Sequence, residues 1–260
     1  MPWRMLMIMT VILAAIDPPA HAGHPLLTDD AETQGPGNVL VESSINYLKD
    51  NEFKSTVVPV AVTVGIGETM DVAVEMPYLS LHPSQATGNN ESGLSDVFFR
   101  FKHRFYEHEK KGGGRDQFEQ SLAYQVAFSQ PTGSEEKGLG SGTQRWGGRL
   151  ISSTEWEFVE INANLGYESS GRALRRGNFT YDYAVAMSIT AKYERSKPWE
   201  PAVELLVVRV KETDVSRIAN VLIALIYEPS EQYYVDAGVR VGLNANSEDY
   251  GLQAGFGYKF

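Results

Sequence analysis

The chain ends in the stretch Tyr250–Phe260, YGLQAGFGYKF. Apolar residues occupy every second position of this stretch, and glycine, glutamine and lysine occupy the positions between them. An alternation with period two is typical of a β-strand whose two faces meet different surroundings. In a soluble sandwich the apolar face points into the core, whereas in an outer-membrane barrel it points to lipid and the polar face points to the lumen. The last stretch alone is compatible with both folds.

The amino terminus indicates export. One basic residue, Arg4, precedes an apolar run from Met5 to Ile16, and Ala20-His21-Ala22 follows as a small-residue cleavage site. An anchoring helix would need roughly 17–25 apolar residues, and Asp17-Pro18-Pro19 ends the run earlier. We therefore predict that residues 1–22 are a signal peptide cleaved after Ala22, and that the mature protein leaves the cytoplasm.

The composition excludes several classes of protein. The 260 residues contain no cysteine, so an exported chain of this size has no disulfide framework. The net charge of −10 argues against a nucleic-acid partner, because proteins that bind nucleic acids present basic surfaces. A soluble secreted domain and a barrel, whose strands carry only half of their residues in lipid, both agree with the remaining composition.

Twelve strand-like segments fill the chain after an irregular, acidic lead-in at residues 23–37 that we place in the periplasm. Most of them alternate, whereas Pro201–Val210 and Ala219–Glu228 are apolar on both faces over much of their length. An even number of strands puts both ends of a bacterial single-chain barrel on the periplasmic side. We therefore predict an all-β fold, an antiparallel up-and-down transmembrane β-barrel over residues 38–260. The twelve segments are Val39–Tyr47, Val58–Ile66, Met70–Tyr78, Asp96–Phe105, Phe118–Phe128, Arg149–Phe158, Ile161–Tyr167, Tyr181–Glu194, Pro201–Val210, Ala219–Glu228, Gln232–Asn244 and Tyr250–Phe260.

The connections sort by length into two sets, which a sandwich would not require. Long connections are predicted on the outer side, at Ser80–Gly93, Gln130–Gly147, Ser169–Phe179, Lys211–Ile218 and Asn244–Asp249. Short turns are predicted on the inner side, at Gly65–Thr69, Val159-Glu160, Arg195–Trp199 and Pro229–Glu231. Glu107–Asp116 is also an inner turn in this scheme, although it is longer than the others.

Aromatic residues gather near the ends of the predicted strands, as in the girdles that mark the two membrane interfaces. The last residue, Phe260, lies on the outward face, and Tyr258 precedes it on that face. Many outer-membrane barrels end on such a residue, because the barrel assembly machinery reads the terminal aromatic strand. We predict that Tyr258 and Phe260 are this assembly signal.

The chain resembles a known family in layout from about Asn38 to Phe260, and specifically in one block. The block from Phe128 to Tyr167, with Pro131-Thr132-Gly133, Gly138-Leu139-Gly140-Ser141-Gly142 and Asn164-Leu165-Gly166-Tyr167, is similar to the family named putative MetA-pathway of phenol degradation. Members of this family are described as outer-membrane transporters. The resemblance implies a barrel that passes small solutes, aromatic and hydrophobic compounds among them, and it brings no catalytic motif with it.

The sequence does not predict an enzyme, a cofactor or a metal site. The histidines that follow the predicted signal peptide are His24, His82, His103 and His108, and none lies on a polar strand face beside a candidate serine nucleophile. The glycine stretches lack the Gly-Lys-Ser/Thr ending of a phosphate loop. The expected partners are outer-membrane lipid, the barrel assembly machinery and a small-molecule solute.

The polar faces of the strands define the candidate site, which is the lumen. Arg100, Lys102 and Arg104 on one strand face acids across it, and such an arrangement would select solutes by charge. The alternative is a structural or binding barrel whose charges pair and close the interior. Leu26–Gln34 could fold back as a plug, but disorder is the stronger expectation at this length. The predicted lumen residues are Glu42, Asp71, Glu75, Asp96, Arg100, Lys102, Arg104, Gln125, Arg149, Glu155, Glu157, Asp182, Lys192, Asp236 and Arg240.

Overall fold

The structure is a computed structural model that describes most of the chain. The described residues are 24–51, 53–83, 89–110, 117–169, 181–191, 198–209, 218–245 and 247–260, with the side chains of 169, 181–186 and 209 left out. The predicted signal peptide, the predicted loop at Ser169–Phe179 after its first residue, and Lys192 therefore lie outside the described residues.

The described residues form thirteen strands in one antiparallel sheet. The short β4 only extends the sheet beside one end of β3, so twelve strands make the wall of the barrel. The strands are β1 Val39–Lys49, β2 Phe53–Gly67, β3 Met70–Pro83, β4 Glu91–Leu94, β5 Val97–Lys110, β6 Phe118–Gln130, β7 Arg145–Trp156, β8 Val159–Ser169, β9 Tyr181–Ala191, β10 Trp199–Arg209, β11 Ile218–Ser230, β12 Tyr233–Gly242 and β13 Tyr250–Lys259.

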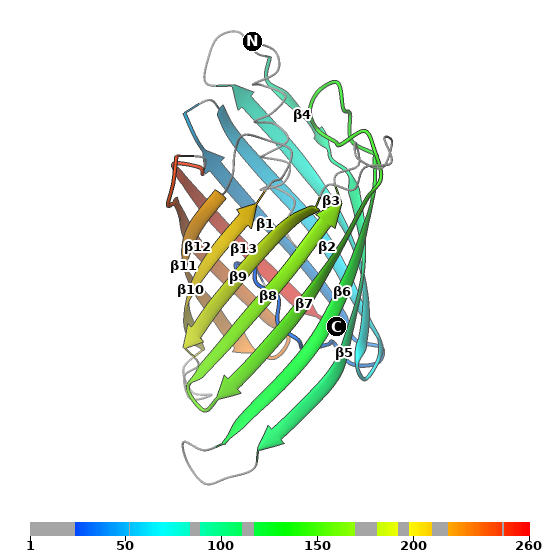
Figure 1. The fold of residues 1–260 in the computed structure, drawn as a ribbon, viewed down its shortest axis with the longest axis vertical. Coiled ribbons are helices and arrows are strands. Elements are labelled where there is room, and N and C mark those ends of the chain that lie inside the picture. Colours follow the sequence, from blue (N-terminus) through cyan, green and yellow to red (C-terminus); the bar gives the residue numbers. More distant parts are fainter. Residues whose placement is uncertain are drawn as a thin grey trace.

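The sheet closes on itself, and each wall strand pairs with its neighbours in sequence (Figure 1). The first and last strands form the seam, with Leu40 opposite Lys259 and Lys49 opposite Tyr250. Val39 and Phe260 exchange backbone hydrogen bonds of 3.3 and 2.8 Å at the end of this seam. The predicted twelve-strand antiparallel barrel is confirmed, and its closure leaves no long free edge in the wall.

The two faces of each strand differ as the alternation predicts. On β13, Leu252 and Phe256 are each 49% exposed on the outside, whereas Gln253 is 8% exposed on the inside. Large apolar side chains are exposed all around the outside, and most of the buried side chains on the inside are polar or charged. This is inverted relative to a soluble protein and matches a barrel that faces lipid. Among the described residues, no helix is long and apolar enough to cross a membrane.

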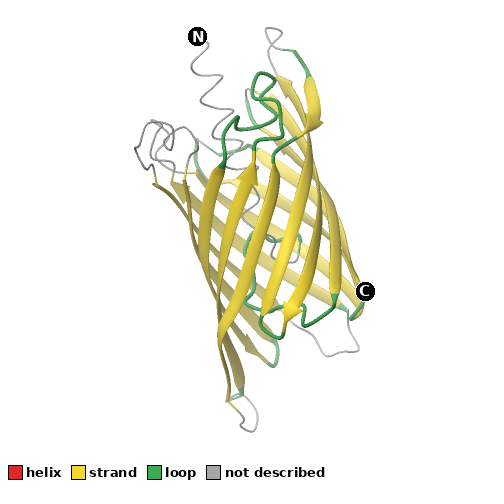
Figure 2. Ribbon diagram, turned by 90° about the vertical axis from the view of Figure 1, so that its right-hand side faces the viewer, coloured by secondary structure: helices red, strands yellow, loops and turns green. Residues whose placement is uncertain are grey.

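The two ends of the barrel carry different connections (Figures 1 and 2). The end opposite the termini of the wall bears the longer connections, and we call it the outer end; the end at Val39 and Phe260 is the inner end. One predicted turn is wrong in part, because β5 and β6 continue as a hairpin to Lys110 and Phe118, where the sequence predicts a turn from Glu107. The hairpin projects beyond the inner rim, and a bulge between Arg104 and Tyr106 bends it there.

A glycine-rich loop, residues 131–144, is folded tightly at the outer end. Asp96 anchors it, accepting hydrogen bonds from the backbone N–H of Gly133 at 3.1 Å and from the Ser141 hydroxyl at 2.6 Å. A Cβ on Gly140 would collide with the Asp96 carboxylate and the Gly133 backbone. The glycines that carry the family resemblance are therefore needed for close backbone approach. Leu139, at the tip, is buried against Val57, Leu79 and Leu81 on the lumen side of the wall.

Candidate functional site

The lumen is occupied by the lead-in, residues 24–37, which precedes β1. Thr28 and Ala31 are 0% exposed and Asp29 is 1% exposed, all inside the ring of strands. The expectation that Leu26–Gln34 is disordered is wrong. The segment has no helix or strand of its own, and its order comes from contacts with strands that are far away in sequence, which local composition does not reveal. We call residues 24–37 the lumen segment.

Glu204 on β10 holds the middle of the lumen segment. One of its carboxylate oxygens, Oε2, accepts hydrogen bonds from the backbone N–H of Leu27 at 2.7 Å, from the N–H of Thr28 at 2.5 Å and from the Thr28 hydroxyl at 2.6 Å. Glu204 is 1% exposed. A buried carboxylate with three donors on one oxygen is a charge-assisted contact, stronger than hydrogen bonds between neutral groups.

Asn164 on β8 binds the backbone of Asp29 through both polar atoms of its side-chain amide. Its Oδ1 accepts from the Asp29 N–H at 2.7 Å, and its Nδ2 donates to the Asp29 carbonyl at 2.7 Å. The reciprocal pair satisfies both backbone groups of Asp29 where water is excluded, and an unsatisfied group there would be costly.

The Asp29 side chain meets a cationic part of the wall. Lys102 Nζ lies 3.3 Å from its carboxylate, Gln125 donates to it at 3.1 Å, and Lys102 also lies 3.6 Å from Asp30. The pKa of Asp29 is raised to about 6, mainly because burial disfavours the charged carboxylate. The negative charge of Asp30 also raises this pKa, whereas the positive charges of Lys102 and of Arg149 on β7 lower it. The Asp29 carboxyl therefore titrates close to neutral pH while the segment is docked.

Further contacts fix the two ends of the lumen segment. Toward the inner rim, the N–H of Gln34 donates to the Asp71 carboxylate at 3.1 Å. At the start, His24 lies 2.7 Å from Asp236 on β12 and 3.2 Å from Asn46 on β1. The segment thus runs from mid-barrel to the inner rim and contacts strands on all sides of the lumen.

Glycines on the inner face make room for these contacts, and they include those of the terminal stretch. A Cβ on Gly255 would lie 2.5 Å from His24 Nδ1, and one on Gly65 would collide with the carbonyl of Gly35. A Cβ on Gly257 would collide with the ring of Tyr234, whose hydroxyl donates to the Glu42 carboxylate. The polar face of the last strand is therefore glycine-rich because the lumen segment and a tyrosine pack against it.

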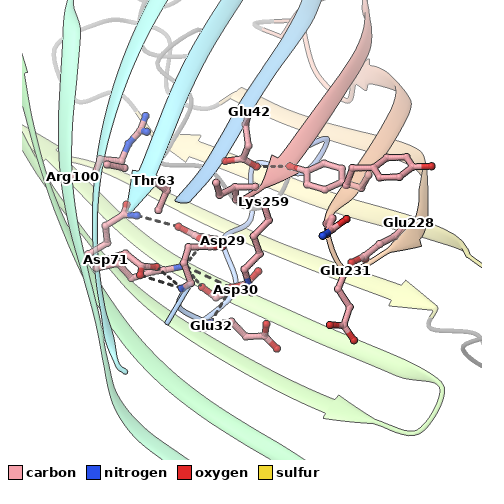
Figure 3. Close-up of a pocket in the computed structure, with 18 residues that line it drawn as sticks. Asp29, Asp30, Glu32, Glu42, Thr63, Asp71, Arg100, Glu228, Glu231 and Lys259 are labelled. Atoms are coloured by element: carbon pink, nitrogen blue, oxygen red, sulfur yellow. Dashed lines mark hydrogen bonds and ion pairs between the residues drawn. The ribbon is translucent and has the colours of Figure 1, made fainter. Parts of the chain in front are cut away.

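A polar cavity of about 250 Å³ remains beside the lumen segment toward the inner end (Figure 3). Its lining has more acidic than basic side chains. The acids are Asp29, Asp30, Glu32, Glu42, Asp71, Glu228 and Glu231, and the bases are Arg100, Lys102 and Lys259. Seven carboxylates against three cations give this end of the lumen a negative potential when the acids are ionised.

The outer half of the lumen is lined differently. Inward-facing apolar residues on β2, β3 and β5 lie opposite a second apolar set on β10 and β11, and both are buried. The first set is Val57, Leu79, Leu81 and Phe98, and the second is Leu206, Val208, Ile218 and Leu222. The lumen is therefore acidic toward the inner end, whereas the outer end carries apolar patches beside charged pairs such as Arg145–Asp96 and Arg240–Glu248.

Most of the predicted lumen residues lie inside the barrel. Those that are at most 8% exposed are Glu42, Asp71, Glu75, Asp96, Arg100, Gln125, Arg149, Asp236 and Arg240. Lys102, Arg104 and Glu155 are partly buried on the same face. Glu157 lies in an exposed turn beyond β7 rather than on the lumen wall, because β7 ends at Trp156. The side chain of Asp182 and all of Lys192 lie outside the described residues.

Many of the predicted charges form ion pairs inside the barrel. Arg100 lies 2.5 Å from Glu75, Arg145 lies 3.9 Å from Asp96, and Arg240 lies 3.8 Å from Glu248. Tyr258 and Phe260 face outward, with ring centroids 4.7 Å apart. Sequence reasoning missed three contacts of the lumen segment: Glu204, Asn164 and Ser153, whose hydroxyl accepts from the Ala31 N–H at 2.8 Å. An acid flanked by the apolar residues Val203 and Leu205 in β10 was the available signal for Glu204.

Several solved structures have a similar fold. A COG4313 outer membrane channel from Pseudomonas putida F1 has a TM-score of 0.68 at 10% identity, over 89% of this chain and 98% of that one. The NanC porin has a TM-score of 0.55 at 11% identity, over 85% and 100%. The KdgM porin has a TM-score of 0.51 at 8% identity, over 85% and 99%. At such identities these likenesses establish the fold.

Comparison with protein families covers nearly the whole chain. No curated protein matches the sequence. Residues 22–260 match the family described as Putative MetA-pathway of phenol degradation, the family that the loop and strand motifs resemble. The match includes every described strand of the barrel and the lumen segment, and so the chain belongs to this family.

Proposed function

We propose that the protein is an outer-membrane channel through which small solutes pass passively. The observation that carries this proposal is how the lumen is filled. In a closed structural barrel the side chains of the wall fill the interior, which suits about eight strands. Here the twelve-strand wall leaves space that a separate segment occupies, joined covalently to the wall only where it leads into β1. Displacing that segment would open a passage.

Several features support a place in the outer membrane. The outside carries a continuous apolar surface with tyrosines toward the strand ends, as lipid-facing barrels do. The solved structures of similar fold are an outer membrane channel and porins. We further propose export through a signal peptide cleaved after Ala22, and assembly by the machinery that reads the terminal strand.

The lining of the lumen supports passage of small apolar and aromatic solutes through the outer half. Leu79, Phe98 and Leu206 are buried, and Leu139 of the outer loop covers Leu79. Displacing the loop would expose these apolar side chains to such compounds. The acidic cavity beyond it faces the inner end, where the solute would leave into water. The family description, which refers to phenol degradation, agrees with aromatic compounds as solutes.

One observation favours the alternative, a permanently closed barrel. The lumen segment is held by many hydrogen bonds to buried groups, among them those of Glu204 and Asn164. Electrical recording separates the two functions. A closed barrel inserted in a planar bilayer carries no current, whereas the proposed channel gives discrete current steps.

The acidic cavity predicts that these steps are cation-selective. A charge about 10 Å from an ion in water contributes about 0.4 kcal/mol, a factor of about two in the local ion concentration. Replacing the exposed rim residues Glu228 and Glu231 by Gln is therefore expected to lower the cation-to-anion permeability ratio roughly two- to fourfold. The reversal potential in a KCl gradient measures this ratio. Glu136→Gln, in the outer loop, is the matched control and should leave the ratio unchanged.

The Asp29 carboxyl predicts a pH dependence of closure. In the docked segment the pKa of the Asp29 carboxyl is about 6, whereas in a released segment it has the ordinary pKa of 3.8. A pKa raised by docking means that docking is strongest at low pH and weakens as the pH rises toward 6. Between about pH 7 and pH 5 the docking equilibrium is expected to shift about tenfold toward closure.

Open probability in planar bilayers measures this shift. Asp29→Asn should remove most of the dependence between these two pH values. If the variant responds to pH as the wild type does, other lumen carboxylates are responsible.

A further inference from the structure

Three basic side chains form a row on the outward face of the barrel, at the outer end. Lys49 on β1 lies opposite Lys54 on β2, and Lys54 lies opposite His82 on β3. All three have the strand parity of the lipid-facing residues, which places them outside the lumen. Tyr250 on β13 lies opposite Lys49 and extends the row by one strand. We call Lys49, Lys54 and His82 the basic row.

The two lysines of the basic row are close together, and no described acid forms an ion pair with them. Directly opposite residues on antiparallel strands have Cβ atoms about 5 Å apart, and like charges in such a pair are destabilising. Neither lysine forms an ion pair within the described part of the chain. On the lipid-facing side of the described wall strands around the row, β13 and β1 to β3, there is no aspartate or glutamate. The nearest described acids, Asp50 and Asp249, lie in the turns beside Lys49, and neither forms an ion pair with the described lysines.

The height of the row matches the level of lipid headgroups. From Val39 to Lys49 the strand rises ten residues of about 3.3 Å, which at a tilt of about 40° spans about 25 Å, the height of the apolar band of such barrels. Lys49 Nζ lies 5.5 Å from the centroid of the Tyr250 ring, and the rings of Tyr47 and Tyr250 are 6.2 Å apart. An aromatic pair beside a lysine is typical of a membrane interface.

We propose that the basic row binds the phosphate groups of a phosphorylated glycolipid in the outer leaflet, of the lipid A type. This assignment rests on the proposed function, which places the outer end of the barrel at the outer leaflet. A phosphate between Lys49 and Lys54 relieves their mutual repulsion and accepts charge-assisted hydrogen bonds from both. His82, one strand further and about 10 Å from Lys49 across two strand spacings, is placed for a second phosphate of the same headgroup. The acyl chains then lie along the apolar face below.

Lipid retention tests the basic row. The full mature protein, refolded in phosphatidylcholine vesicles doped with bisphosphorylated lipid A, is extracted, and the lipid bound to it is quantified by native mass spectrometry. Each basic residue near a membrane surface contributes about 1 kcal/mol, so a Lys49→Gln, Lys54→Gln double variant should retain lipid A roughly 10- to 30-fold less tightly. Lys110→Gln is the matched control, because Lys110 also lies over an aromatic ring, that of Phe118, but at the inner end.

The outcomes separate this proposal from the proposed function. Equal retention by the double variant, or equal retention of dephosphorylated lipid A or phosphatidylglycerol by the wild type, overturns the lipid site. A loss confined to the double variant and to phosphorylated glycolipid supports it. Conductance is recorded separately: a protein that retains lipid A but carries no current refutes the channel, and a conducting protein without lipid preference refutes only the basic row.

Discussion

Deletion of residues 24–36 is expected to raise the single-channel conductance about tenfold, because it removes the segment that occupies the barrel lumen. The segment contributes no strand to the wall, so the barrel closure between β1 and β13 is retained. Planar-bilayer recording of the truncated and full mature proteins provides the measurement. Heat-modifiable migration on gels shows that the truncated protein is still a folded barrel. A truncated barrel with unchanged conductance would mean that the outer loop, not the lumen segment, limits the current.

A milder change tests the same point without deletion. The chain has no cysteine, so a single introduced thiol reports its own accessibility. Thr28→Cys places a thiol where the side chain is 0% exposed beside Glu204, and it should react with a water-soluble maleimide only when the segment leaves the lumen. Glu32→Cys, at an exposed position of the segment, is the matched control and should react at once. Adding Glu204→Gln should speed labelling of the Thr28→Cys variant, because it weakens the hydrogen bonds to Glu204 Oε2.

Replacement of Phe260 by Asp is expected to remove most of the folded protein from the outer membrane of living cells. Phe260 is 71% exposed on the lipid side, and its backbone pairs with Val39 at the seam. An acid at the membrane interface costs only about 0–1 kcal/mol, which is too little to unfold the barrel. A large loss in cells would therefore reflect failed recognition of the terminal strand during assembly.

Refolding in vitro distinguishes recognition from stability. Purified Phe260→Asp should fold into lipid vesicles almost as well as the wild type, since no assembly machinery takes part. Phe260→Tyr keeps an aromatic terminus and should restore assembly in cells. Normal assembly of the Asp variant in cells would refute the role of Phe260, whereas failure in both settings would assign the effect to stability.

The wall of the barrel was predictable because its signal is local. In a strand such as Met70–Tyr78 every second residue faces lipid, so alternation marks both the strand and its faces. The filling of the lumen was not predictable in the same way. His24 contacts Asp236 and Thr28 contacts Glu204, and no short-range pattern links residues so far apart. In the sequence Gly255 and Gly257 read only as part of a polar face, because the side chains packed on them come from distant segments.

The docked lumen segment also constrains the order in which the chain can assemble. The Pro25 carbonyl accepts a hydrogen bond from Gln253, and His24 contacts Asp236. The first residues of the described chain can therefore dock only after the last strands have formed. Contacts of such sequence separation carry a large loop-closure entropy and form slowly. The binding groups of the segment come from β1, β3, β5 to β8, β10, β12 and β13, a set that comes together only once the sheet has curled. The sheet must therefore close around the segment when β1 pairs with β13, or the segment must enter afterwards through the inner end of the barrel.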